Sequence, residues 1–145
     1  MHVSPASILV PGHKYMEAHM PVEVIIVALS FAALGTVGLF WPRRIYAEFG
    51  VELDTPDSRN EVRGVYGGMC TALAGALFLT PALGAAGTGV LIAMMAALGG
   101  MAGGRIFSLF IERTGRSPIV FLVLEAVGAG LLYRVIDFAS LTSEA

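Results

Sequence analysis

Charged residues are scarce in this chain. Its 145 residues include nine Lys or Arg and eleven Asp or Glu, so 14% are charged, while 56% are hydrophobic. The mean hydropathy is +0.76. Soluble domains typically have about 25% charged and about 45–50% apolar residues, so both departures predict an integral membrane protein. The net charge of −2 argues against nucleic acid as a partner, because that role requires a basic surface.

Cysteine is almost absent too. Cys70 stands alone, which excludes an internal disulfide and a cysteine-based metal cluster. In the N-terminal segment, His13, Glu17 and His19 do not have the i, i+4 histidine spacing of helical zinc sites. No serine–histidine–aspartate set, phosphate loop or carboxylate pair is recognisable. We therefore predict no enzyme, no cofactor and no metal site.

What the sequence does have is long apolar runs. Four of them reach the roughly 20 residues needed to cross the hydrocarbon core, and they cover Pro21–Trp41, Val62–Leu83, Thr88–Ile111 and Pro118–Phe138. Sustained alternation of the β-barrel type is absent. A soluble helical bundle is disfavoured because Gly89–Gly104 has no polar face. The sequence therefore predicts an all-α fold, a bundle of four transmembrane helices.

The predicted membrane domain covers residues 21–138, between a flexible N-terminal tail (1–20) and a polar C-terminal tail (139–145). No apolar stretch in the first twenty residues is long enough for a signal peptide. Gly84–Gly87 is predicted to form a tight turn between the second and third spans, and the charged stretch ERTGRS, 112–117, separates the third from the fourth.

The longest polar stretch, residues 43–61, joins the first two spans. Ile45, Tyr46 and Phe49 are spaced as one apolar stripe of a short amphipathic helix lying on the membrane surface. The stretch Thr55–Ser58 is a helix-start signal, in which Ser58 and Glu61 have the spacing of a capping box. We expect the second span to begin with an extra polar turn.

The basic residues predict the orientation. The two charged loops lie on one side of a four-helix hairpin pair and carry six arginines, whereas the other side has only Lys14 and Arg134; the six are Arg43, Arg44, Arg59, Arg63, Arg113 and Arg116. The positive-inside rule places these loops in the cytoplasm. We expect a multi-pass protein of the bacterial inner membrane, with both termini on the periplasmic side.

Two opposite charges fall within the predicted spans. Glu125 is seven residues into the fourth span, about 10 Å below the cytoplasmic boundary at 1.5 Å per residue. Arg105 is six residues before the end of the third span, about 9 Å deep by the same rise. An unpaired charge at that depth costs roughly 2.5–3.5 kcal/mol on insertion scales. We therefore predict that Arg105 and Glu125 form an ion pair between neighbouring antiparallel helices.

Other polar residues are predicted to surround this pair. Asn60, Arg63 and Tyr66 share one face of the second helix, and Ser108 lies one turn beyond Arg105. Two guanidiniums beside one deep carboxylate would favour a small anion, a carboxylate or a lipid phosphate. The other interpretation is that Arg105 and Glu125 only fix the register of two helices, while Arg63 extends to lipid headgroups.

Small residues recur at four-residue spacing in three spans. Gly99, Gly100, Gly103 and Gly104 form two overlapping GxxxG pairs, Gly68, Ala72 and Ala76 form a second row, and Ala126 and Gly130 form a third. Such rows permit close approach of membrane helices. We expect packing inside the bundle to use them, and the oligomeric state stays open.

A family resemblance rests on three stretches of polar residues between the apolar runs. They are RNEVRGVYGG at 59–68, GRIFSLFIERTGRSP at 104–118 and Leu124-Glu125. Over about residues 22–138 the chain resembles a bacterial family of small four-helix integral membrane proteins catalogued as a domain of unknown function. The resemblance implies a fold and a location but no activity, and the matching polar positions are Asn60, Arg63, Tyr66, Arg105, Ser108 and Glu125.

Three functions are compatible with this sequence. The first is a non-enzymatic membrane protein that binds a small anionic ligand or lipid headgroup, or serves as an accessory subunit of a larger membrane complex. The second is a small proton-coupled transporter using Glu125. Against it, Glu23 lies at the mouth of the first helix and the deep acid has an arginine at its level. A membrane enzyme, the third, lacks a recognisable nucleophile.

Overall fold

The computed structural model describes residues 20–136, and that range is helical without strands. Four of its helices are long and apolar enough to cross a membrane, namely Val22–Phe40, Pro56–Ala82, Ala85–Ile111 and Arg116–Val135. Each overlaps a predicted span, so the predicted all-α architecture with four potential membrane spans is confirmed. The tails predicted at 1–20 and 139–145 lie outside the described residues, Met20 excepted, as do His13, Glu17 and His19.

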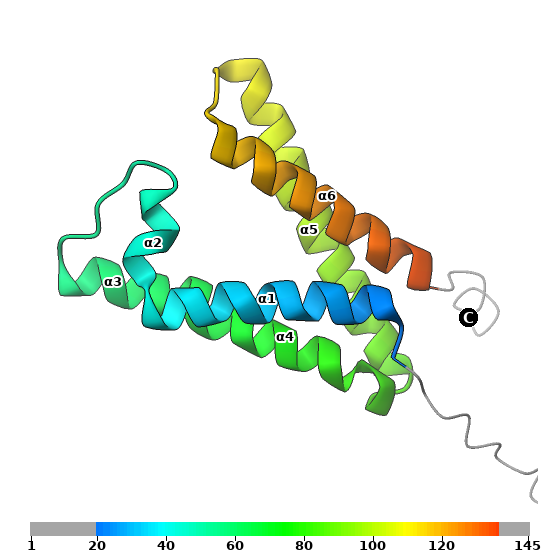
Figure 1. Ribbon diagram of the computed structural model, residues 1–145. Helices are drawn as coiled ribbons and strands as arrows, with labels where there is room; N and C mark the ends of the chain where they lie inside the picture. The colour runs from blue at the N-terminus through cyan, green and yellow to red at the C-terminus, as the bar shows by residue number, and fades with distance from the viewer. Residues whose placement is uncertain (1–19, 137–145) are drawn as a thin grey trace, which may run out of the picture.

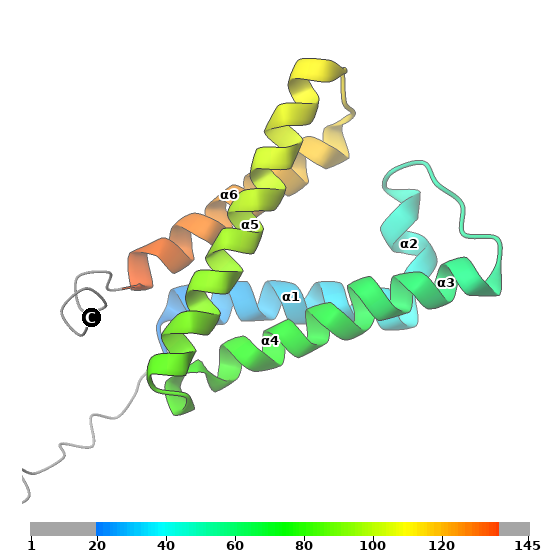
Figure 2. The same ribbon diagram turned by 180° about the vertical axis from the view of Figure 1, so that it is seen from behind.

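The four long helices form two antiparallel hairpins. In the first, α1 (Val22–Phe40) packs along the π-helical segment η1 (Arg63–Met69) and along α4 (Cys70–Leu79). In the second, α5 (Ala85–Ile111) packs along α6 (Arg116–Val135). The hairpins meet near the turn between α4 and α5 and diverge from there, as both views of the molecule show (Figures 1 and 2).

The main apolar core lies where the hairpins meet. Val24 of α1, Leu77 of α4 and Leu132 of α6 are fully buried there, and Leu91 and Met94 of α5 complete it. All four long helices therefore contribute to one contact region near the N-terminal end of α1. In a membrane, dispersion between such well-packed side chains stabilises helix association, because lipid tails are as apolar as leucine.

The turn that joins the hairpins is shorter than predicted. A 3₁₀ turn, η2 (Thr80–Ala82), ends the first hairpin, and α5 already begins at Ala85 instead of after Gly87. Gly84 has φ +54°, a conformation that favours glycine over side chains with a Cβ. Gly87 lies within α5 and packs directly on the carbonyl oxygen of Thr80, which brings the two hairpins together.

Helix α1 lies in close backbone contact with η1 and with the start of α4. A Cβ at Gly38 would lie 2.6 Å from the backbone nitrogen of Gly67, and one at Gly35 would lie 2.8 Å from that of Thr71. In the other direction, a Cβ at Gly67 would lie 2.7 Å from a methyl group of Leu39. These glycines therefore allow the backbones of α1 and η1 to touch.

The predicted role of the glycines on the third span is wrong. Side chains added at Gly99, Gly100, Gly103 or Gly104 would meet nothing within 4 Å, and all four residues are exposed. The reason is that the hairpins diverge, which leaves this face of α5 without a neighbouring helix. Gly68, Ala72, Ala126 and Gly130 are likewise exposed, and the close contact on α6 is made by Gly128 against Leu98 instead.

Two short helical segments lie between α1 and η1, where the sequence predicts one amphipathic surface helix and an extra polar turn before the second span. They are α2 (Pro42–Ala47) and α3 (Pro56–Val62). Ile45 does not form a membrane-facing stripe with Phe49, because Ile45 is buried in a small second core with Leu53 and Val62. Phe49 lies beyond the end of α2 and remains partly exposed.

The predicted capping box at Ser58 and Glu61 is also wrong. The N-cap of α3 is Thr55, whose Oγ1 accepts a hydrogen bond from the backbone N–H of Ser58 at 3.1 Å. Pro56 occupies the first helical position, where its missing N–H has no cost. The helix therefore begins three residues earlier than a cap at Ser58 would allow, which makes the second long helix continuous from Pro56.

We expect Thr55→Ala to lower the free energy of unfolding by about 1 kcal/mol, the usual cost of removing an N-cap oxygen. Ser58→Ala is the comparison: it removes the hydrogen bonds between the Ser58 hydroxyl and Thr55 but keeps the backbone N–H that Thr55 Oγ1 accepts from, so we expect a smaller loss. Reversible unfolding in detergent measures both. An equal loss for the two variants would contradict the assignment of Thr55 as the cap.

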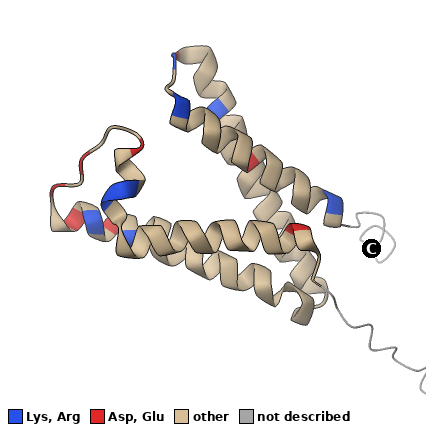
Figure 3. Ribbon diagram, viewed as in Figure 1, with Lys and Arg blue, Asp and Glu red and all other residues tan. Residues whose placement is uncertain are grey.

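Charged residues are concentrated at the diverging ends of the hairpins (Figure 3). Arg43 and Arg44 lie in α2, Arg59 in α3, and Arg116 at the start of α6. At the joined end, Glu23 is in the first turn of α1 and Arg134 in the last turn of α6. The uneven distribution of basic residues along the sequence therefore corresponds to a difference in charge between the two ends of the folded protein.

Candidate functional site

Arg105 of α5 and Glu125 of α6 form the ion pair that the sequence predicts. The Nε of Arg105 donates to Oε1 and Oε2 of Glu125 at 3.0 and 2.8 Å, and Nη2 donates to Oε1 at 2.9 Å. Glu125 is buried, with 7% of its surface exposed. Such two-pronged pairing fixes both the distance between the helices and the orientation of the guanidinium plane.

Two aromatic rings lie beside this ion pair, one against Arg105 and the second against the first ring. The guanidinium carbon of Arg105 lies 5.3 Å from the ring centre of Phe121, which is one turn before Glu125 on α6. Phe49, from the segment after α2, stacks on Phe121 with ring centres 5.6 Å apart. Cation–π contact and stacking therefore connect the first hairpin to the second across the diverging ends.

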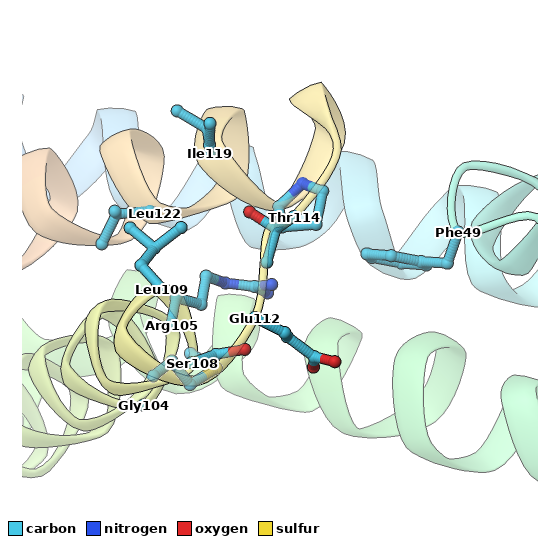
Figure 4. A pocket seen from close by; sticks show the side chains of 11 residues that line it. Phe49, Gly104, Arg105, Ser108, Leu109, Glu112, Thr114, Ile119 and Leu122 are labelled. Carbon is cyan, nitrogen blue, oxygen red and sulfur yellow. The ribbon is translucent and has the colours of Figure 1, made fainter.

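A pocket of about 420 Å³ opens beside Arg105, between α5, the start of α6 and Phe49 (Figure 4). Its wall is largely apolar, and Arg105, Ser108, Glu112 and Thr114 supply the polar groups; the apolar lining comprises Phe49, Met101, Gly104, Leu109, Pro118, Ile119 and Leu122. Nη1 of Arg105 makes no hydrogen bond within residues 20–136. Arg105 can therefore hold Glu125 and still offer N–H donors to a ligand.

Thr114 supplies a second unused polar group in this pocket. Its Oγ1 is buried, and it has no hydrogen-bond partner among the described residues. A buried hydroxyl without a partner costs about 1–3 kcal/mol relative to a paired one. A ligand oxygen beside Thr114 would remove that cost. The pocket thus combines a guanidinium and a hydroxyl that can both donate to the same anionic group.

A family model described as a domain of unknown function, DUF4345, matches residues 21–136. The chain belongs to the DUF4345 family. No curated protein and no solved structure matches it. The family match covers all four long helices of this DUF4345 protein and both members of its buried ion pair. Because the family description names no activity, function has to be argued from the geometry of the site.

The predicted polar cluster is only partly assembled in this DUF4345 protein. Arg105, Ser108 and Glu125 lie together, whereas Arg63 turns to α1 and its Nε donates to the backbone oxygen of Leu39 at 3.1 Å. Asn60 is exposed on α3. Arg63 and Asn60 do not line the pocket. The predicted pocket with two guanidiniums is therefore wrong.

Tyr66 takes an intermediate position. Its ring meets that of Tyr46 edge to face, with centres 5.9 Å apart, and it borders the small second core. Tyr66 is near enough to Arg105 for an electrostatic interaction, although it does not line the pocket. It therefore lies beside the second core and outside the pocket.

The prediction for the second helix failed for two reasons. It assumed 3.6 residues per turn, but Arg63–Met69 is π-helical, and its wider turn changes which residues share a face. In addition, η1 packs against α1 instead of α5, because the hairpins diverge at this end. Arg63 consequently donates its hydrogen bond to a backbone carbonyl at the carboxyl-terminal end of α1. Arg105 is the arginine that lines the pocket.

Three residues of the site were not selected from the sequence: Phe49, Thr114 and Phe121. Phe121 precedes Glu125 by four residues, so helical spacing alone places it on the same face and could have identified it. Thr114 has no such signal, because its burial depends on how the 112–115 turn folds. Phe49 was predicted to face the membrane surface, and only the folded structure shows that its ring stacks on Phe121 of α6.

Proposed function

We propose that this DUF4345 protein is a non-enzymatic membrane protein that binds the phosphate headgroup of a phospholipid between α5 and α6. The supporting observation is the position of Arg105. Glu125 fixes its guanidinium through Nε and Nη2, while Nη1 remains for a ligand in the adjoining pocket. A guanidinium held in this way is preorganised for an oxygen anion, and the Thr114 hydroxyl provides a second donor.

A phospholipid fits this pocket better than a dissolved anion. Arg105 is a single cation and is already paired with Glu125, so attraction for a free ion in water is weak. The lining beyond the polar groups is apolar, with Met101, Leu109 and Leu122 exposed to the pocket. An amphiphile can place its phosphate at Arg105 and its acyl chain along these side chains, and burial of the chain adds affinity.

The proposed location is the bacterial inner membrane, with the diverging ends of the hairpins in the cytoplasm and both termini outside. Arg43, Arg44, Arg59 and Arg116 of these ends support that orientation. Arginines at this level would attract anionic lipids of the inner leaflet. Arg105 lies about 9 Å from Ile111, the last residue of α5. Because its long side chain can extend toward the membrane surface, a phospholipid headgroup can reach the guanidinium.

Proton-coupled transport through Glu125 has less support. A transporting carboxylate must exchange protons with water, whereas both oxygens of Glu125 accept hydrogen bonds from Arg105 and the residue is buried. An accessory role in a larger membrane complex is compatible with lipid binding, because a bound lipid can fill the space beside α5. Retained partner subunits would reveal such a complex.

Native mass spectrometry of the protein from mild detergent tests the proposal. With added phospholipid, we expect the unmodified protein to retain one lipid and Thr114→Val to bind it roughly tenfold more weakly, the effect of losing one hydrogen bond to a charged group. Thr114→Val leaves the Arg105–Glu125 pair intact. Arg134→Gln, at the joined end, is the control and should bind as the unmodified protein does.

Equal lipid retention by Thr114→Val and the unmodified protein would contradict the proposal. Arg105→Lys gives a second test that keeps the positive charge. Lysine cannot pair with Glu125 through two prongs and donate to a phosphate at the same time. We expect weaker lipid retention from Arg105→Lys as well, and unchanged retention would assign the pocket no role in binding.

A further inference from the structure

Glu112 gives the pocket a negative group opposite Arg105. It is the C-cap of α5, it lines the pocket, and its carboxylate makes no hydrogen bond or ion pair with any residue in the range 20–136. Figure 4 shows its side chain on the same side of α5 as Ser108 and Arg105. Glu112 is exposed, so it can meet a ligand at the mouth of the pocket.

The end of α5 adds to this negative charge. The carboxyl-terminal end of a helix carries about half a negative elementary charge, and a carboxylate there is unfavourable unless a cation is nearby. The last turn of α5 contains no basic residue. Arg113 and Arg116 follow in the loop and at the start of α6, but neither lines the pocket. Glu112 and the carbonyl groups before it are therefore negative groups at the mouth of the pocket that a cationic group of a ligand would offset.

The positive and negative groups of the pocket lie at different depths along α5. Arg105 and Glu112 are seven residues apart, so they lie on the same face of α5, about 10 Å apart along the helix axis. Both side chains line one pocket, and the Glu112 carboxylate points away from the Arg105 guanidinium (Figure 4). A zwitterionic headgroup, which carries a phosphate and an ammonium a few bonds apart, matches this order of charges, with the phosphate deep and the ammonium outside.

We propose that Glu112 makes the pocket selective for phospholipids whose headgroup ends in a primary ammonium. This inference rests on the proposed phospholipid site. A primary ammonium has three N–H donors for the Glu112 carboxylate and the carbonyls of α5. A glycerol headgroup has no positive charge to offset the carboxylate, and a choline headgroup has no N–H to donate. Arg113 and Arg116 would attract every phosphate headgroup and do not discriminate between these lipids.

Competition between phospholipids with identical acyl chains tests the selectivity. Purified protein in mild detergent is mixed with equal amounts of phosphatidylethanolamine and phosphatidylglycerol, and the bound lipids are counted by native mass spectrometry. We expect a preference of about tenfold for phosphatidylethanolamine, as for one hydrogen bond to a charged group. Glu112→Gln should abolish that preference, and phosphatidylcholine should bind more weakly than phosphatidylethanolamine to the unmodified protein.

Glu61→Gln is the control, because Glu61 is an exposed carboxylate of α3 outside the pocket. It should keep the preference of the unmodified protein. If both phospholipids bind equally well before and after Glu112→Gln, the selectivity is overturned while the phospholipid site stands. If neither phospholipid binds the unmodified protein better than it binds Thr114→Val, the site itself is overturned and the selectivity with it.

Discussion

Glu125→Leu is expected to lower the free energy of unfolding by about 3 kcal/mol or more, the usual cost of breaking a buried ion pair from one side. The reason is that Arg105 then remains at the same depth without its carboxylate, and 29% side-chain exposure does not let water replace all of the lost hydrogen bonds. Reversible unfolding in detergent measures the loss.

Leu124→Ala is the control for this result. Leu124 is the neighbour of Glu125 on α6, but it is 60% exposed on the outer face of the hairpin. In detergent its truncation should change the free energy of unfolding by less than about 1 kcal/mol, because no cavity forms. If Glu125→Leu is no more destabilising than Leu124→Ala, the ion pair does not hold α5 and α6 together.

Gly38→Ala should be the second severe change. The new Cβ would lie 2.6 Å from the backbone nitrogen of Gly67 and 2.7 Å from the carbonyl carbon of Tyr66. Overpacking usually costs about 1–3 kcal/mol, and a loss near 3 kcal/mol is expected here because backbone atoms cannot rotate away. The same unfolding assay in detergent measures the loss.

Gly103→Ala provides the matched control with the identical substitution. Its Cβ would meet nothing within 4 Å, so the packing is unaffected. Alanine also favours helix over glycine by up to about 1 kcal/mol, so this variant should be as stable as the unmodified protein or slightly more stable. A large loss for Gly103→Ala would mean that another chain or helix covers this face of α5.

The contrast between these two glycines shows where sequence reasoning stops. Gly99, Gly100, Gly103 and Gly104 have the spacing of a packing motif, yet they face open space. Gly35 and Gly38, which are three residues apart, make close backbone contacts instead. A spacing motif indicates that close approach is possible, but the angle between the two hairpins decides which glycine has a partner.

The Arg105–Glu125 pair could be predicted because its cause is local. Both residues lie in apolar runs, and counting along two antiparallel helices from their common turn puts them at one depth. The same count wrongly placed Arg63 beside Arg105. Arg63 begins a π-helical segment, and the first hairpin turns away from α5 at that end. Pairing within a hairpin is therefore predictable, whereas contact between hairpins depends on tertiary geometry.

The pair also explains how one arginine can serve both the structure and the binding that we propose. Without Glu125, the guanidinium would be free to extend toward the headgroups, and its position in the pocket would be lost. With Glu125 bonded to Nε and Nη2 and the Phe121 ring against the guanidinium, Arg105 keeps one orientation, and Thr114 and Ser108 line the same pocket. Stability of the hairpin and shape of the pocket thus depend on the same contact.

A double-mutant cycle over Arg105 and Glu125 tests this account most directly. The free energies of unfolding of the unmodified protein, Arg105→Leu, Glu125→Leu and the double variant are measured in one detergent. We predict a coupling energy of about 3 kcal/mol, with the double variant more stable than either single variant, because two leucines leave no unpaired charge. Additive losses, with a coupling energy near zero, would contradict the account.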